Sequence, residues 1–132
     1  MITVLANGCF DILHPGHLAH LREARAMGHR LIVALTADEC VNKGKDRPFH
    51  KWVDRAALLR ELRCVDAVIP TVSSVAAIRL VRPTIFVKGI DYVKGDRFTE
   101  DIAGACAEVG ADLRFTRAPK QSIAETLRRV AA

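Results

Sequence analysis

Two histidines, His14 and His17, stand three residues apart and are the side chains of this sequence best suited to chemistry. A short apolar, β-branched run, Ile2 to Ala6, predicts a strand before them, and apolar residues at helical spacing follow them as far as Gly28. A helix that begins near Pro15 brings both imidazoles to one face. The N–H groups of its first turn have no partner within the helix and lie at the positive end of its dipole, so they favour an anion. We therefore predict a phosphate site with two proton-bearing donors.

Two other interpretations of the histidine pair stay open. A zinc site would need a third ligand, and no nearby Cys, Glu or His stands at a familiar spacing. A histidine at this position could also serve only as a helix cap. The residues around the pair favour the phosphate site.

These surrounding residues form a longer pattern, Gly8-Cys9-Phe10-Asp11 followed by His14-Pro15-Gly16-His17. The pattern resembles the HxGH signature of the nucleotidylyltransferase superfamily, whose small bacterial members include glycerol-3-phosphate cytidylyltransferases and the adenylyltransferase domain of ADP-heptose synthases. The similarity runs from Ile2 to about Leu127. It implies transfer of a nucleoside monophosphate from an NTP (ATP or CTP) to a small phosphorylated acceptor, with release of pyrophosphate. It also implies Mg²⁺ bound to the triphosphate and a homodimer.

The resemblance also assigns roles to residues. His14 and His17 would stabilise the charge that develops during transfer, and the backbone amides of Cys9 and Phe10 would meet the triphosphate. Asp11 could support a histidine or the loop backbone, or be an ordinary turn residue, and the Phe10 side chain could belong to the core. The nucleotide-binding residues that the resemblance implies are Gly8, Cys9, Phe10, Asp11, Gly16, Arg63, Lys88, Gly89, Asp91, Arg117 and Ser122.

Basic side chains form a second group of candidates. In the loop that follows the second strand, related enzymes place a lysine that contacts the triphosphate or the acceptor. One of Lys43, Lys45 and Arg47 is expected to take this role, and the sequence alone does not decide between them. Arg55 and Arg63 align with family arginines near the phosphates, where a guanidinium can bind two oxygens at once. Either arginine could instead form a salt bridge on a helix surface. The predicted catalytic residues are His14, His17, Lys43 and Arg55.

Two later segments concern the substrates. Val87-Lys88-Gly89-Ile90-Asp91-Tyr92 resembles the Val-Lys-Gly-Gly-Asp-Tyr segment of heptose-phosphate adenylyltransferases, so Lys88 and Asp91 are expected to meet the nucleotide or the acceptor. We therefore predict adenylyl transfer to a sugar phosphate of the heptose 1-phosphate type. The short chain leans toward a glycerol-3-phosphate cytidylyltransferase, the nearest alternative, and a flavin-nucleotide adenylyltransferase is a more distant one. Where the family carries several Ser and Thr residues before its last helix, this chain keeps Ser122 and no Thr, although Lys120 could replace lost donors. This change motivates a further alternative, a non-catalytic nucleotide-binding module.

Strand-like runs alternate with helical patterns along the whole chain. This alternation predicts a single α/β domain, residues 1–132, with a Rossmann-like, doubly wound, five-stranded parallel sheet and helices on both faces. Ligands of such sheets bind beyond the carboxyl ends of the strands. The expected strands are Ile2–Ala6, Leu31–Leu35, Ala67–Ile69, Ile85–Val87 and Leu113–Phe115, and the expected helices are Gly16–Met27, Val53–Arg63, Ser74–Val81, Thr99–Val109 and Ile123–Val130.

Composition narrows the function classes. A formal charge of +5, from 20 Lys and Arg against 15 Asp and Glu, suggests polyanionic ligands. The basic residues gather in loops and not in a stripe with aromatics, so we do not expect nucleic acid as the partner. The four cysteines are widely spaced without a Cys-x-x-Cys pair, which indicates reduced thiols, no protein-held metal and a cytoplasmic protein. The longest apolar run, Leu31 to Leu35, has the length of a strand, so no membrane segment is expected.

Overall fold

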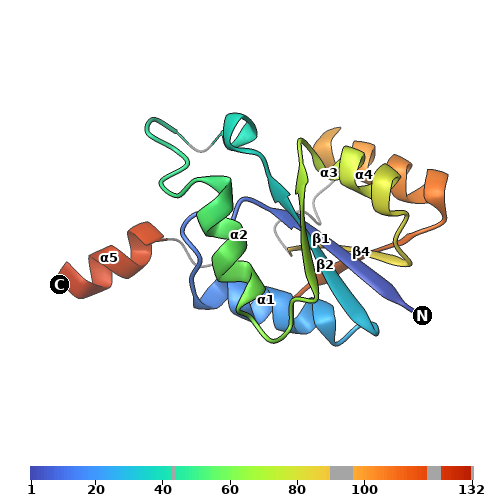
Figure 1. Ribbon diagram of the computed structural model, residues 1–132, viewed down its shortest axis with the longest axis horizontal. Coiled ribbons are helices and arrows are strands. Elements are labelled where there is room, and N and C mark those ends of the chain that lie inside the picture. Colours follow the sequence, from blue (N-terminus) through green and yellow to red (C-terminus); the bar gives the residue numbers. More distant parts are fainter. Residues whose placement is uncertain (43, 90–96, 119–122, 132) are drawn as a thin grey trace.

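Five parallel strands form one sheet in the part of the chain that the computed structural model describes, residues 1–42, 44–89, 97–118 and 123–131 (Figure 1). The strands are β1 (Thr3–Gly8), β2 (Arg30–Thr36), β3 (Ala67–Thr71), β4 (Ile85–Gly89) and β5 (Asp112–Thr116). Their order across the sheet is β3-β2-β1-β4-β5. The chain therefore runs outward from β1 to β3 and then crosses to the other side of β1, which confirms the predicted doubly wound topology.

The helices follow the predicted pattern; the bounds of the third, Ser74–Val81, are those predicted, and the others differ at one or both ends. They are α1 (Pro15–Arg25), α2 (Trp52–Arg60), α3 (Ser74–Val81), α4 (Arg97–Val109) and α5 (Ile123–Ala131), and a 3₁₀ turn that was not predicted, η1, spans Asp38–Cys40.

Each strand continues past its predicted end, because the ladder persists into polar and glycine residues after the apolar pattern stops. Helix α2 ends before the predicted Arg63. The N–H groups of Glu61 and Leu62 donate to the carbonyls of Leu58 and Leu59, three residues earlier, which is the 3₁₀ pattern that closes a helix.

Alternate strand residues face two separate cores, so helices cover both faces as predicted. Helices α1 and α2 cover one face, where Leu21 and Leu59 are fully buried. Helices α3 and α4 cover the other face, where Ile78 and Phe86 are fully buried. Successive residues of a strand point to opposite faces, and both sets are apolar, as a parallel sheet with two covered faces requires.

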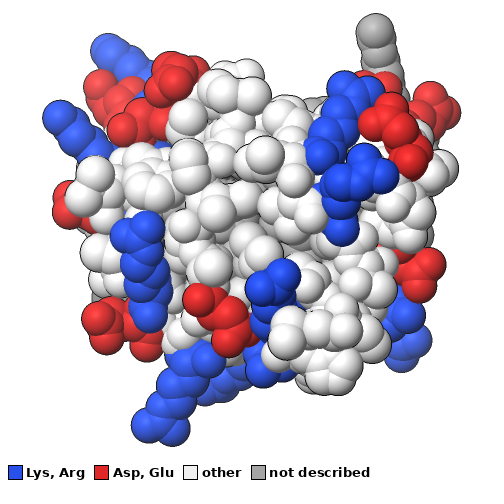
Figure 2. Space-filling model, turned by 45° about the vertical axis from the view of Figure 1, so that its right-hand side comes forward, with Lys and Arg blue, Asp and Glu red and all other residues white. Residues whose placement is uncertain are grey.

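The molecular surface adds two observations. Helix α5 extends away from the sheet (Figure 1), and its Leu127 and Val130 are exposed. On the face drawn in Figure 2, basic and acidic side chains are interspersed around a broad uncharged area. Within the described ranges, no helix is both long enough and apolar enough to cross a membrane.

Gly28 lies at the close approach between the end of α1 and β1. A Cβ atom on Gly28 would lie 2.7 Å from Cγ2 of both Ile2 and Val4, and 2.9 Å from the Ile2 carbonyl oxygen. A β-branched side chain and a backbone oxygen cannot move aside easily, so a side chain at this position would push α1 away from the strand that precedes its histidines.

We expect Gly28→Ala to lower the free energy of unfolding by about 1–3 kcal/mol, the usual cost of overpacking. Gly104→Ala is the matched control, because Gly104 lies in α4 and an added Cβ would meet no atom within 4 Å. That control should stabilise the protein by about 0.5–1 kcal/mol, since alanine favours a helix interior. Urea unfolding of both variants measures the two effects, and equal stability of Gly28→Ala and the unchanged protein would contradict the steric argument.

Candidate active site

The two ladders on either side of β1 end at different points. Strand β1 pairs with β2 as far as Gly8, but with β4 only as far as the pair of Ala6 with Val87. Beyond that pair, Gly8 stays on β2 while Lys88 and Gly89 stay on β5. Because the strand order reverses at this place, it is where a doubly wound sheet receives its ligand. We call it the β1–β4 opening.

The turn after β1 folds back onto its own strand. Phe10 has a left-handed φ of 48°, and its ring is buried in the core on the α1 side. A Cβ on Gly8 would lie 2.8 Å from that ring, so the close approach requires glycine. The Phe10 side chain thus belongs to the core, one of the alternatives left open by the sequence. The expected contact of the Cys9 and Phe10 amides with a triphosphate stays a prediction.

His14 and His17 form a reciprocal cap at the start of α1. The Gly16 N–H donates to His14 Nδ1 at 3.1 Å, and the His14 N–H donates to His17 Nδ1 at 3.2 Å. The two rings stack with centroids 3.8 Å apart, and the Phe10 ring meets His17 edge-on at 5.1 Å. The helix-cap interpretation is therefore confirmed as one role of the pair. The Gly16 amide, expected to face an anion, is already satisfied inside the cap.

This cap decides which ring nitrogen carries the proton. An Nδ1 that accepts a backbone N–H carries no proton, so the neutral ring must carry its proton on Nε2. Both imidazoles are thereby held in the tautomer whose Nε2–H is a donor. The cap and a donor role toward phosphate oxygens are compatible, because they use opposite nitrogens of the same rings.

Asp11 connects the turn after β1 to the segment before α2. Its carboxylate is buried and accepts the N–H groups of Phe49 at 2.7 Å and His50 at 3.0 Å, and Arg47 Nε at 2.9 Å. Burial alone would raise the pKa of Asp11, but the two backbone donors and the Arg47 guanidinium outweigh it and lower the pKa. Asp11 supports the loop backbone, one of the roles expected for it.

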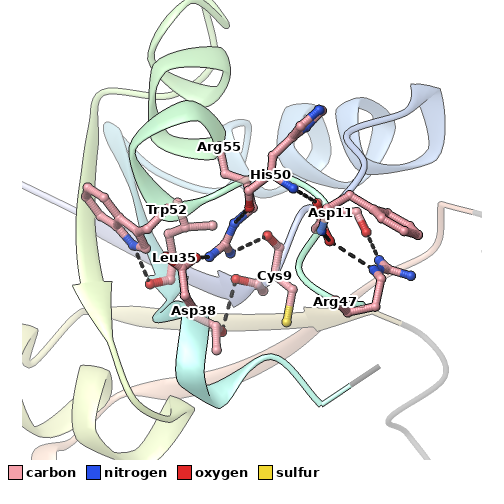
Figure 3. Close-up of polar contacts among 11 residues, drawn as sticks. Cys9, Asp11, Leu35, Asp38, Arg47, His50, Trp52 and Arg55 are labelled. Carbon is pink, nitrogen blue, oxygen red and sulfur yellow. Dashed lines mark hydrogen bonds and ion pairs between the residues drawn. The ribbon is translucent and has the colours of Figure 1, made fainter. Parts of the chain in front are cut away.

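Arg55 lies at the centre of the same loops (Figure 3). Its side chain has no exposed surface, and its guanidinium donates to the carbonyls of His50 and Cys9, each at 2.9 Å, and to Asp38 Oδ1 at 2.6 Å. It therefore joins the segments that follow β1 and β2 to the start of α2. In this conformation Arg55 positions the loops, and the phosphate contact expected from the sequence stays a prediction.

Lys88 provides a buried cation on the other side of the β1–β4 opening. It is 7% exposed, and its Nζ lies 5.8 Å from the centroid of the Phe86 ring. Burial lowers the pKa of Lys88 from 10.5 to about 8, and the nearby Cys9 acts in the opposite direction. The structure thus brings Cys9, directly after β1, and Lys88, on β4, into one electrostatic environment.

The remaining predicted residues are distributed differently. Arg117 is exposed directly after β5, at the same edge of the sheet, and Gly89 ends β4 there. Arg63 is exposed just before β3, at the opposite edge, so the structure does not bring it to the other candidates in this chain. Lys43, Asp91 and Ser122 lie outside the described residues. Among those described, no group of three His, Cys, Asp or Glu side chains could hold a metal ion.

Sequence reasoning missed several residues that shape this site. Asn7 Nδ2 donates to the Ala34 carbonyl at 2.8 Å and its Oδ1 accepts from Ser74, which ties the end of β1 to β2 and α3. His20 and Glu23, on α1, contact the end of β5. His20 carried a signal, because it stands three residues after His17, as His17 does after His14. The others have no pattern that distinguishes them from ordinary surface polar residues.

Comparison with known proteins identifies the family. The model of the cytidylyltransferase-like family matches residues 5–125. The chain belongs to the cytidylyltransferase-like family. Its relatives include the bifunctional protein HldE of Nitrosococcus oceani, 48% identical over 110 residues, and that of Coxiella burnetii, 50% identical over 93 residues. These matches cover 80% and 67% of this chain, which spans only about a fifth of each relative, 22% and 20%. The resemblance seen in the sequence is confirmed.

Solved structures agree with this assignment. The lipopolysaccharide core biosynthesis protein of Thermoplasma volcanium is 30% identical, with a TM-score of 0.74 over 92% of this chain and 99% of that one. Pantothenate synthetase of Thermus thermophilus is 17% identical, with a TM-score of 0.60 over 99% of this chain and 61% of that one, and shares the fold. The Rossmann-like fold predicted from the sequence is confirmed.

The buried ammonium of Lys88 predicts a pH dependence of stability. Its pKa is lower in the folded than in the unfolded protein, so the cost of burying the charge is fully present below about pH 8 and disappears as the pH rises toward 10.5. We expect Lys88→Met to raise the urea midpoint at pH 7, and this gain to shrink between pH 8 and 10. Lys51→Met, at an exposed position, corrects for the loss of one formal charge. A gain that stays constant up to pH 10 would contradict the burial argument.

Proposed function

We propose that this chain is a nucleotidyltransferase that moves the adenylyl group of ATP onto a sugar phosphate of the heptose 1-phosphate type, releasing pyrophosphate. The observation that carries the proposal is the reciprocal cap of His14 and His17 beside the β1–β4 opening, which makes both Nε2 atoms hydrogen-bond donors. Family membership supports the reaction class.

In this reaction an oxygen of the acceptor phosphate attacks the α-phosphorus of the nucleotide, and the bond from that phosphorus to pyrophosphate breaks. Negative charge grows on the equatorial and leaving oxygens. The Nε2–H groups of His14 and His17 would donate to these oxygens, and the cap fixes the planes of the two rings. Arg55 and Asp11 would act behind them by holding the loops in place.

Mg²⁺ would enter with the nucleotide, since the ion prefers oxygen ligands and commonly uses substrate phosphates. When bound it would neutralise charge on the triphosphate. The described donors at this edge are imidazoles, amides and cations, which suit phosphate oxygens better than they suit the ion itself. The residues present therefore fit an ion carried mainly by the substrate.

Adenylyl transfer to a heptose-type acceptor is favoured by the Val87-Lys88-Gly89 segment and by the HldE relatives. Cytidylyl transfer to glycerol 3-phosphate is the second candidate, supported by the name of the matching family model. We further propose a homodimer and a cytoplasmic location, from the family resemblance and the four free thiols. The interspersed charges of Figure 2 give no support to a nucleic-acid partner on that face.

The test is pyrophosphate release with Mg²⁺ from ATP, CTP, GTP and UTP, each combined with heptose 1-phosphate, glycerol 3-phosphate and FMN. We expect release from ATP with heptose 1-phosphate. Release only from CTP with glycerol 3-phosphate would keep the reaction class and replace both substrates. Nucleotide binding by calorimetry, with no release from any pair, would favour a non-catalytic nucleotide-binding module.

We expect His17→Ala to lower kcat by about 10²–10³-fold, the usual cost of losing one donor to a developing oxyanion. His29→Ala is the matched control, because His29 also accepts a backbone N–H through Nδ1 but lies beside Ile2 at the opposite edge of the sheet. It should leave kcat unchanged. Thermal unfolding of both variants accounts for the lost cap bond, and unchanged turnover of a folded His17→Ala would rule out this mechanism.

A further inference from the structure

The two halves of the β1–β4 opening belong to different ladders. One half carries Gly8 at the end of β1, followed by His14 and His17 at the start of α1, and the other carries Lys88 on β4 and Arg117 after β5. No β1–β4 pair lies beyond Ala6 and Val87 in the register of the described strands, so the ladder does not set the separation of the two halves. A ligand held by both halves requires something else to set that separation.

Helix α1 makes two polar contacts that cross to the second half. His20 Nδ1 lies 2.5 Å from Thr116 Oγ1, at the last residue of β5. The Glu23 carboxylate accepts the Arg117 N–H, with oxygens at 2.6 and 3.0 Å. His17, His20 and Glu23 follow at intervals of three, so the contacts lie along the helix face that starts with His17. We call these two contacts the α1–β5 clamp.

The clamp lies in a largely buried environment that contains a buried cation. Thr116 is fully buried, so removing its partner would leave a buried hydroxyl unsatisfied. Burial lowers the pKa of His20, the positive charge of Lys88 lowers it further, and Glu23 opposes both. His20 is thus kept neutral beside a buried cation. The ion pair of Arg25 with Asp66, at the other end of α1, points instead toward the β2–β3 half.

We propose that the α1–β5 clamp sets the width of the β1–β4 opening, which makes His20 and Glu23 positioning residues for nucleotide binding. This inference rests on the proposed function only for the identity of the ligand. Helix α1 begins with the reciprocal cap of His14 and His17. The clamp therefore ties the position of these histidines to that of Lys88 and Arg117. Without the clamp the two halves would separate and close again, and only the closed arrangement would bind nucleotide well.

Such a loss has a characteristic kinetic signature. If the closed arrangement were present one tenth of the time, the apparent Kd for nucleotide would rise about tenfold. Bound nucleotide would hold the opening closed, so kcat would change little. Displacement of the His14 and His17 rings would lower kcat instead. The split between KM and kcat therefore separates a clamp from a general disturbance of α1.

The test compares Thr116→Val, which removes the hydroxyl and keeps the shape, with Thr116→Ser, which keeps the hydroxyl. We expect Thr116→Val to raise KM and the calorimetric Kd for Mg-ATP about tenfold, with kcat within about twofold, and Thr116→Ser to match the unchanged protein. Glu23→Ala provides a second variant at a half-buried site, should Thr116→Val fail to fold. Arg25→Gln is the control on the same helix and should leave Kd unchanged.

Calorimetry keeps this inference separate from the proposed function. If the unchanged protein binds ATP but releases no pyrophosphate from any pair, the proposed function fails while the Kd comparison still tests the clamp. Equal Kd values for Thr116→Val, Glu23→Ala and the unchanged protein would overturn the clamp, as would a fall in kcat at constant KM. Absence of nucleotide binding by the unchanged protein would overturn both.

Discussion

The separation of β1 from β4 beyond the pair of Ala6 with Val87 is the constraint on which the rest of the site depends. It arises from topology, because the chain winds outward from β1 in one direction and returns to β4 on the other side. Within the sheet, the end of β1 therefore pairs with β2 alone, and the end of β4 with β5 alone. Every functional side chain that the structure describes at this edge belongs to one half or the other, and long-range contacts must bring the halves into register.

Two buried ionic side chains organise the loops of the first half. Asp11 holds the segment before α2 through two backbone N–H groups, and Arg55 holds the segments that follow β1 and β2 through carbonyls and Asp38. A buried charge that loses its partners is costly, so each residue requires the others to stay in place. The network gives little net stability by comparison with an apolar core, but it specifies one loop arrangement.

The histidine pair shows that a structural and a chemical role can depend on each other. The Nδ1 atoms accept backbone N–H groups and begin the helix, and this forces the proton of each neutral ring onto Nε2. The same bonds also fix the ring planes, which stack at 3.8 Å. The cap thus supplies both the tautomer and the orientation that a donor to phosphate oxygens requires, before any ligand binds.

The sequence by itself determined the alternation of five strands with five helices, the doubly wound parallel sheet and the family, because apolar periodicity and the Gly8 to His17 pattern are local signals. It also identified His14 and His17 as a pair, since three residues is a helical spacing. Only the tertiary structure decided what the basic residues do: it buried Arg55 behind the loops and placed Arg63 at the opposite edge. It alone revealed that His20 meets Thr116, 96 residues away along the chain. Contacts of that kind depend on how α1 packs across the sheet, and no local pattern encodes that packing.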